Sequence, residues 1–272
     1  MTRGVGAALR RQRALTVAAL VCLVALAWAW LLLGAGMDMA PHAALDLFPH
    51  ATTPAMEMGA GMDMDMAPAG WGVAEFTLAV SMWWVMMIAM MLPAAAPVIL
   101  LYDRTAQRSL QSARPATGSF LAGYLAIWAL FSLLAAALQW ALQRSDLLAP
   151  ETLGSMARWF SAAVLFAAGL YQLSPYKEAC LRHCRNPASF LTRHYRPGRV
   201  GAFRLGAIHG SYCVGCCWLL MALLFVGGVM NLAWIALLTL LVAAEKLLPA
   251  GRGVAIAAGL GLIAWGGATA FA

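Results

Sequence analysis

The sequence predicts an all-α, polytopic helical membrane protein with about seven transmembrane helices. Its 272 residues are 63% hydrophobic and only 11% charged, whereas soluble domains average about 45–50% apolar and about 25% charged residues. This composition excludes a soluble enzyme, a disordered chain and a nucleic-acid-binding protein. A membrane-spanning helix requires about 20 apolar residues, and seven stretches qualify: 14–35, 73–101, 118–142, 156–173, 206–229, 231–249 and 253–271.

Basic residues predict the orientation of these stretches, because Lys and Arg are concentrated in cytoplasmic segments. With the N-terminus inside and the C-terminus outside, sixteen of the eighteen Lys and Arg residues become cytoplasmic, and only Arg144 and Arg158 do not. The expected parts are a cytoplasmic N-terminus and first transmembrane helix at 1–35, an extracytoplasmic Met-rich flexible loop at 36–72, and a six-helix membrane core at 73–272 with a cytoplasmic Cys/His loop at 174–205.

The loop at 36–72 contains seven methionines and five acidic residues, but no Lys or Arg. A thioether is a soft ligand that suits Cu(I) and needs no deprotonation. Acidic neighbours raise the local concentration of cations. We therefore expect Met62, Met64 and Met66 to bind metal, and the alternative is a low-complexity spacer that is rich in Met by chance.

A second group of methionines lies in the stretch 73–101. Helical periodicity places Met82, Met86 and Met90 within an arc of about 80°, and Pro93 falls on the same arc. Pro93 cannot donate a hydrogen bond to the Ala89 carbonyl, which is thereby freed toward the methionine face. This face is a candidate path for a cation, and the alternative is ordinary apolar packing.

Cysteine and histidine form the third and strongest pattern. One group has the helical spacing i, i+3, i+4, and a second group about thirty residues later has the spacing i, i+4, i+7, i+8, so each group shares one helix face. Two such faces provide enough soft ligands for a Cu(I) or Zn(II) site. The candidate ligands are Cys180, His183 and Cys184, followed by His209, Cys213, Cys216 and Cys217.

The same cysteines allow a redox interpretation. Cys213 and Cys216 form a C-x-x-C motif, and Cys180 with Cys184 is a possible second dithiol. Two such pairs can relay electrons by thiol–disulfide exchange, so a membrane thiol–disulfide relay is the alternative function.

Two smaller features concern helix packing and buried charge. Glu245 lies in the predicted sixth span, where a carboxylate is a candidate functional site; the alternative is a neutralised pair with Lys246. Gly206 and Gly210 form a small-x-x-x-small pattern, which allows a neighbouring helix to approach closely.

Four blocks of the sequence resemble an uncharacterised bacterial family described as predicted metal-binding integral membrane proteins. They are SMWWVMMIAMMLPAAAP (81–97), YQLSPYKEACLRHCRNP (171–187), GSYCVGCCW (210–218) and MNLAWIALLTLLVAAEKLLPAGR (230–252). The resemblance implies metal binding without supplying a reaction. The residues that it implies as ligands are Cys180, His183, Cys184, Cys213, Cys216 and Cys217, with Glu245 and Lys246 in the last block.

These observations together predict a multi-pass protein of the bacterial inner membrane that handles Cu(I), with Zn(II) as a second possible metal. Outside methionines would collect copper, the methionine face would pass it inward, and the Cys/His cluster would receive it. The lipid bilayer is one partner, and a metal chaperone or metalloprotein is another. The sequence carries no ATP-binding P-loop, so we expect transport or delivery rather than an enzyme.

Overall fold

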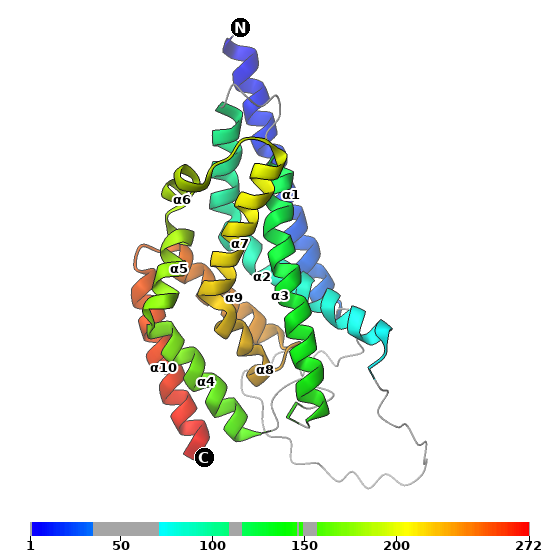
Figure 1. The fold of residues 1–272 in the computed structure, drawn as a ribbon, viewed down its shortest axis with the longest axis vertical. Coiled ribbons are helices and arrows are strands. Elements are labelled where there is room, and N and C mark those ends of the chain that lie inside the picture. The colour runs from blue at the N-terminus through cyan, green and yellow to red at the C-terminus, as the bar shows by residue number, and fades with distance from the viewer. Residues whose placement is uncertain (1, 35–70, 109–115, 146, 149–156, 272) are drawn as a thin grey trace.

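The structure, a computed structural model, describes residues 2–34, 71–108, 116–145, 147–148 and 157–271. The secondary-structure elements in these ranges are all helices (Figure 1), which agrees with the predicted all-α class. The expected ligands Met62, Met64 and Met66 lie outside the described residues. The helices are α1 (Thr2–Leu32), α2 (Val73–Arg108), α3 (Thr117–Arg144), α4 (Arg158–Leu173), α5 (Pro175–Arg185), α6 (Pro187–His194), α7 (Gly198–Ala222), α8 (Leu224–Gly227), α9 (Leu232–Leu247) and α10 (Gly251–Phe271).

Five helical segments in the described ranges are long and apolar enough to cross a membrane. They are Arg11–Leu32, Val73–Ala106, Thr117–Arg144, Gly198–Gly227 and Gly251–Phe271. The other two predicted spans correspond to α4 and α9, which have 16 residues each. At about 1.5 Å per residue such a helix is about 24 Å long, which is less than a hydrocarbon core of about 30 Å.

The segment 174–205, which we expected to be a loop, is instead mostly helical. It contains α5, α6 and the first turns of α7. The helices α5 and α6 each start with a proline in their first turn, a position where the missing N–H costs nothing. The Ser174 side chain also accepts a hydrogen bond from the Lys177 backbone N–H at 3.2 Å and caps α5. This helix presents Cys180 and Cys184 toward α7.

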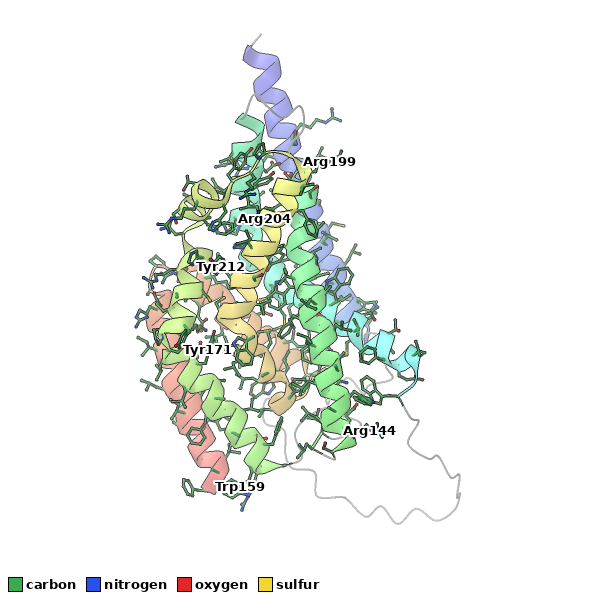
Figure 2. The ribbon with its side chains drawn as sticks, in the orientation of Figure 1. Arg144, Trp159, Tyr171, Arg199, Arg204 and Tyr212 are labelled. Atoms are coloured by element: carbon green, nitrogen blue, oxygen red, sulfur yellow. The ribbon has the colours of Figure 1, made fainter. Side chains whose placement is uncertain are left out.

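The helices form an elongated bundle in which the two chain ends lie at opposite ends (Figure 1). α3 packs along α7, α4 packs along α10, and α2 contacts both α1 and α3. Arg199 and Arg204 lie toward the end that carries the N-terminus, whereas Arg144 and Trp159 lie near the opposite end (Figure 2). The basic N-terminal part of α7 therefore lies at the opposite end of the bundle from Arg144 and Trp159.

Glycines bring the backbones of α3 and α7 into direct contact. A Cβ atom on Gly206 would overlap the carbonyl oxygen of Phe120, and one on Gly123 would overlap the carbonyl oxygen of Phe203. A Cβ atom on Gly210 would lie 3.0 Å from Ile127 Cβ. The close helix approach expected from the Gly206 and Gly210 pattern is confirmed, and its partner is α3.

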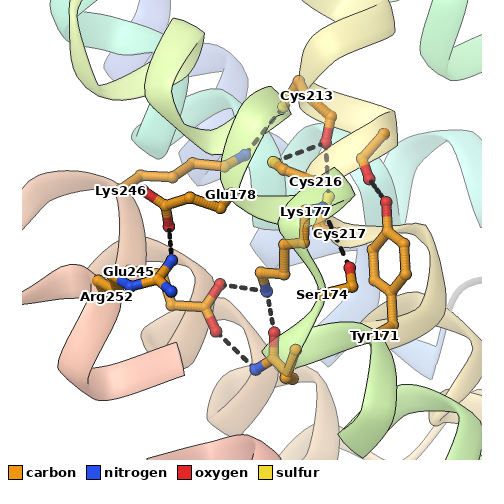
Figure 3. A network of polar contacts seen from close by, with 12 residues as sticks. Tyr171, Ser174, Lys177, Glu178, Cys213, Cys216, Cys217, Glu245, Lys246 and Arg252 are labelled. Carbon is orange, nitrogen blue, oxygen red and sulfur yellow. Dashed lines mark hydrogen bonds and ion pairs between the residues drawn. The ribbon is translucent and has the colours of Figure 1, made fainter. Parts of the chain in front are cut away.

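A buried ion pair connects three other helices (Figure 3). The Lys177 ammonium of α5 donates to Glu245 Oε2 of α9 at 2.6 Å, and Gln172 Nε2 of α4 donates to Glu245 Oε1 at 2.7 Å. Lys177 also donates to Gln172 Oε1. The Glu245 side chain is 2% exposed and that of Lys177 is 1% exposed. The alternative pairing of Glu245 with Lys246 is wrong, since Lys177 occupies that role.

We predict that Gly206→Ala destabilises the protein, because the added Cβ atom meets backbone that cannot move without separating α3 from α7. Overpacking of this kind costs about 1–3 kcal/mol. The midpoint of thermal unfolding in detergent should fall. Gly118→Ala in α3 is the control, because no atom lies within 4 Å of its Cβ position. Equal midpoints for the two variants would contradict the close contact.

We also predict that Glu245→Gln is strongly destabilising, since it leaves the Lys177 ammonium buried without a counter-charge. Removal of one partner of a buried pair costs about 3–5 kcal/mol. The control is Glu178→Gln, whose partner Arg252 is 56% exposed, and an exposed pair contributes about 0–1 kcal/mol. Adding Lys177→Met to Glu245→Gln should recover part of the loss in the unfolding midpoint; no recovery would argue against the pair.

Candidate metal centre

The candidate ligands of α7 lie on one buried face of the helix. Cys213, Cys216 and Cys217 are between 1% and 2% exposed, and His209 is 2% exposed. The helix runs without interruption from Gly198 to Ala222, so the spacing i, i+4, i+7, i+8 aligns these side chains as predicted. They face protein rather than the outer surface of the bundle.

α5 packs against α7 and adds a fourth buried cysteine to this face. Hydrogen bonds to Cys213 and Cys216 raise the pKa of the Cys184 thiol well above its usual value. These bonds link Cys184 of α5 to two cysteines of α7. We call Cys184, Cys213, Cys216 and Cys217 the buried cysteine cluster. The expectation that two helical elements bring their cysteines together is met at these positions.

Cys180 lies one helical turn before Cys184, at the edge of the cluster. It is partly exposed, and partial burial together with the charge of Cys216 raises the pKa of the Cys180 thiol. A Cβ atom on Gly215 would lie 3.0 Å from Cys180 Sγ, so this thiol sits directly against the backbone of α7. The structure thus places Cys180 beside the cluster but outside its buried interior.

The two candidate histidines differ in their surroundings. His209 packs against the rings of Phe120, Tyr124 and Phe190 with centroid distances of 5.3–6.2 Å, and its buried Nδ1 has no hydrogen-bond partner. A buried nitrogen without a partner is uncommon and leaves a lone pair or a proton available. His183 instead stacks on Tyr212 at 4.1 Å, with its Nδ1 2.8 Å from the Ala179 carbonyl.

Two further polar side chains reach the cluster, and their contacts with it were not predicted from the sequence. Lys246 Nζ of α9 donates to Cys213 Sγ at 2.9 Å (Figure 3). The Tyr124 hydroxyl of α3 lies 3.2 Å from the same sulfur and 3.3 Å from the Met91 carbonyl. The ammonium supplies the positive charge that a buried thiolate requires. Sequence analysis named Lys246 in the block 230–252 and as a possible partner of Glu245, but did not predict its contact with Cys213, because that contact depends on how α9 packs against α7.

A methionine of α2 connects the cluster to the methionine-rich helix. The Cys217 thiol lies 3.8 Å from Met91 Sδ, and Met91 is fully buried. Met82, Met86 and Met90 are buried as well, but helical periodicity places Met91 about 100° from Met90 and about 180° from Met82. Met91, the α2 residue that contacts Cys217, follows Met90 in the sequence but lies outside the predicted arc. The sequence argument did not select Met91, because it considered only the face that carries Pro93.

In the described residues, no group of three or more His, Cys, Asp or Glu side chains is arranged to hold a metal ion. The Cys216 and Cys217 thiols both donate to the Cys213 carbonyl, at 3.1 Å and 2.9 Å, so their sulfurs are directed along α7. Four thiols, a thioether and an imidazole form a soft donor set, which fits copper.

Comparison with known proteins gives one family. The model of the PpoB2 copper chaperone family matches residues 80–269. That range contains the buried cysteine cluster, Cys180, both histidines, Glu245 and Met82, Met86 and Met90. No curated protein and no solved structure matches the chain. Since the match extends over more than half of the sequence, the chain belongs to the PpoB2 copper chaperone family.

Proposed function

We propose that this protein is an integral protein of the bacterial inner membrane that takes up Cu(I) and delivers it to a metal chaperone or metalloprotein. One observation carries the proposal: the contact between Cys217 Sγ and Met91 Sδ joins the methionine-rich helix α2 to the buried cysteine cluster. Sulfur ligands thereby follow one another from α2 to α7 and α5. Membership of a copper chaperone family supports copper as the metal.

The donor set favours Cu(I) over Zn(II). Thioether ligands suit Cu(I), whereas Zn(II) sites in proteins are built from thiolate, imidazole and carboxylate. Met91 Sδ lies 3.8 Å from Cys217 Sγ, which places a thioether beside the cluster. All six cysteines are free thiols, the form in which they can bind metal.

In this proposal copper moves through ligands of increasing strength. Met62, Met64 and Met66 collect the ion outside, the methionines of α2 pass it inward, and the cysteine cluster receives it. Exchange of a thioether for a thiolate is favourable for Cu(I) because the thiolate carries negative charge. Met82, Met86 and Met90 form the path, and Met91 is its junction with the cluster.

The proposed topology keeps seven spans, with the N-terminus in the cytoplasm and the C-terminus outside. α4 and α9 make the two shorter crossings. The end of the bundle near Arg144 and Trp159 (Figure 2) carries two cation–π contacts, Arg144 on Trp140 at 5.1 Å and Arg158 on Trp159 at 5.2 Å. Tryptophan is enriched at membrane–water interfaces, so this end fits the outer interface.

We predict that Cys213→Ala combined with Cys216→Ala abolishes tight Cu(I) binding, because it removes two adjacent thiols of the cluster. Copper retained by reduced, anaerobic protein against a Cu(I) chelator is the measurement, with Zn(II) assayed in parallel. Cys22→Ala is the control, since Cys22 is exposed on α1. Unchanged copper in the double variant would refute the site, and tight Zn(II) with no Cu(I) would refute the metal.

The thiol–disulfide relay makes a different prediction for the same thiols. A relay must oxidise Cys pairs during turnover, whereas a metal site keeps its thiols reduced. Alkylation of free thiols in intact cells should therefore find the cluster reduced. A mixed disulfide trapped with a partner by a single-Cys variant would replace the copper proposal by the relay.

We predict that Met91→Leu slows copper entry while the cluster keeps its affinity. The substitution is nearly isosteric and deletes the sulfur that contacts Cys217. The rate at which copper reaches a Cu(I) chelator inside proteoliposomes should fall, and the triple variant Met82→Leu, Met86→Leu, Met90→Leu should behave alike. Met230→Leu, also buried, is the control. Rates equal to wild type in both variants would show that these methionines are packing residues.

A further inference from the structure

We propose that Cys180 is the thiol through which copper is exchanged between the buried cysteine cluster and an external ligand. This inference rests on the proposed function. Cys184, Cys213, Cys216 and Cys217 are buried, whereas Cys180, from the same face of α5, is partly exposed. An ion held by the four buried sulfurs is out of reach of an incoming thiol, so an exchange needs a sulfur at the boundary.

Cys180 is close enough to the cluster to pass an ion on. It precedes Cys184 by one helical turn, so both side chains lie on one face of α5. Cys180 Sγ also lies against α7, 3.0 Å from where a Cβ atom on Gly215 would stand, and Gly215 immediately precedes Cys216. The three cysteines thus provide consecutive sulfurs from the boundary to the interior.

Gly215 provides the space for this arrangement. A Cβ atom at Gly215 would lie 3.0 Å from Cys180 Sγ, which is tighter than ordinary van der Waals contact. The Tyr171 hydroxyl donates a hydrogen bond to the Gly215 carbonyl (Figure 3), which anchors α4 to the same turn of α7. Because Gly215 has no side chain, the Cys180 thiol can lie directly against the backbone of α7, next to the position of Cys216.

α5, the helix that carries Cys180, also carries charged side chains; helical periodicity places Glu178 and Arg185 about 140–160° from Cys180, on its other side. Glu178 pairs with Arg252 of α10 at 2.8 Å, and the arginine side chain is 56% exposed. Arg185 donates to the carbonyl oxygens of Leu248 and Pro249 at 3.1 Å and 2.6 Å. Charged groups with this exposure are stable only in contact with water. α5 therefore lies in contact with water, and Cys180 is the cysteine of this helix that is partly exposed, so it is the sulfur that a soluble copper acceptor or donor would approach.

The exchange is a ligand substitution without electron transfer. The Cys180 thiol loses its proton and its sulfur bonds to Cu(I) while one donor thiolate is still attached. That donor thiolate then leaves and takes up a proton, and Cys216 or Cys184 displaces Cys180 from the ion by the same steps. Copper remains Cu(I) throughout, and release follows the reverse order.

The test compares equilibrium binding with the rate of transfer. We predict that Cys180→Ser keeps the copper stoichiometry and affinity of wild type, but releases Cu(I) to a soluble chelator more slowly by about tenfold, because release then waits for local opening of the α5–α7 contact. The measurement is stopped-flow absorbance of the copper–chelator complex under anaerobic conditions. Cys22→Ser, which replaces an exposed thiol of α1, should release copper at the wild-type rate.

A second variant keeps every sulfur. Gly215→Ala should slow release as well, since the new methyl group displaces Cys180 Sγ, whereas Gly261→Ala in α10, with no atom within 4 Å of its Cβ position, should not. Wild-type release by Cys180→Ser would overturn the inference and leave the copper site intact. Loss of tight binding in Cys180→Ser would also overturn it, by making Cys180 a ligand of the resting site. A wild-type protein that binds no Cu(I) would refute the proposed function itself.

Discussion

The backbone contact between α3 and α7 is the constraint on which the candidate metal centre depends. Gly123 and Gly206 have no Cβ atoms, and only for that reason can the two helices approach so closely. The approach brings Tyr124, the neighbour of Gly123, to 3.2 Å from Cys213 Sγ. It also closes aromatic rings over His209. One face of α7 is thereby sealed, and its sulfurs are directed toward α5, α9 and α2.

Two adjacent buried charged residues of α9 contact different parts of the structure. Glu245 neutralises Lys177 and joins α4, α5 and α9, whereas Lys246 extends to Cys213. Successive residues of a helix are about 100° apart, so the two side chains serve different neighbours. The cysteine cluster consequently has a counter-charge of its own, which would offset the charge of its thiolates when no metal is bound.

Periodicity predicted the local parts of the site well. The alignment of His209, Cys213, Cys216 and Cys217 followed from their spacing, since an uninterrupted helix fixes the angle between its side chains. The Met-rich helix α2 and the close contact at Gly206 were predicted on the same basis. Within 174–205 the shared helix face of Cys180 and Cys184 was predicted from their spacing, but the extent of α5 and α6 was not, because these helices are short and polar and start at prolines rather than from an apolar stripe.

The sequence by itself determined an all-helical chain, the apolar segments and which residues share a helix face, because these properties depend on neighbours within a few positions. Only the tertiary structure decided which faces meet. It selected Met91 rather than Met90 as the contact of Cys217, Lys177 rather than Lys246 as the partner of Glu245, and Cys180 as the exposed edge of the cluster. Each of these contacts depends on how one helix is rotated and shifted along its axis relative to its neighbour. Packing across the whole bundle determines both quantities.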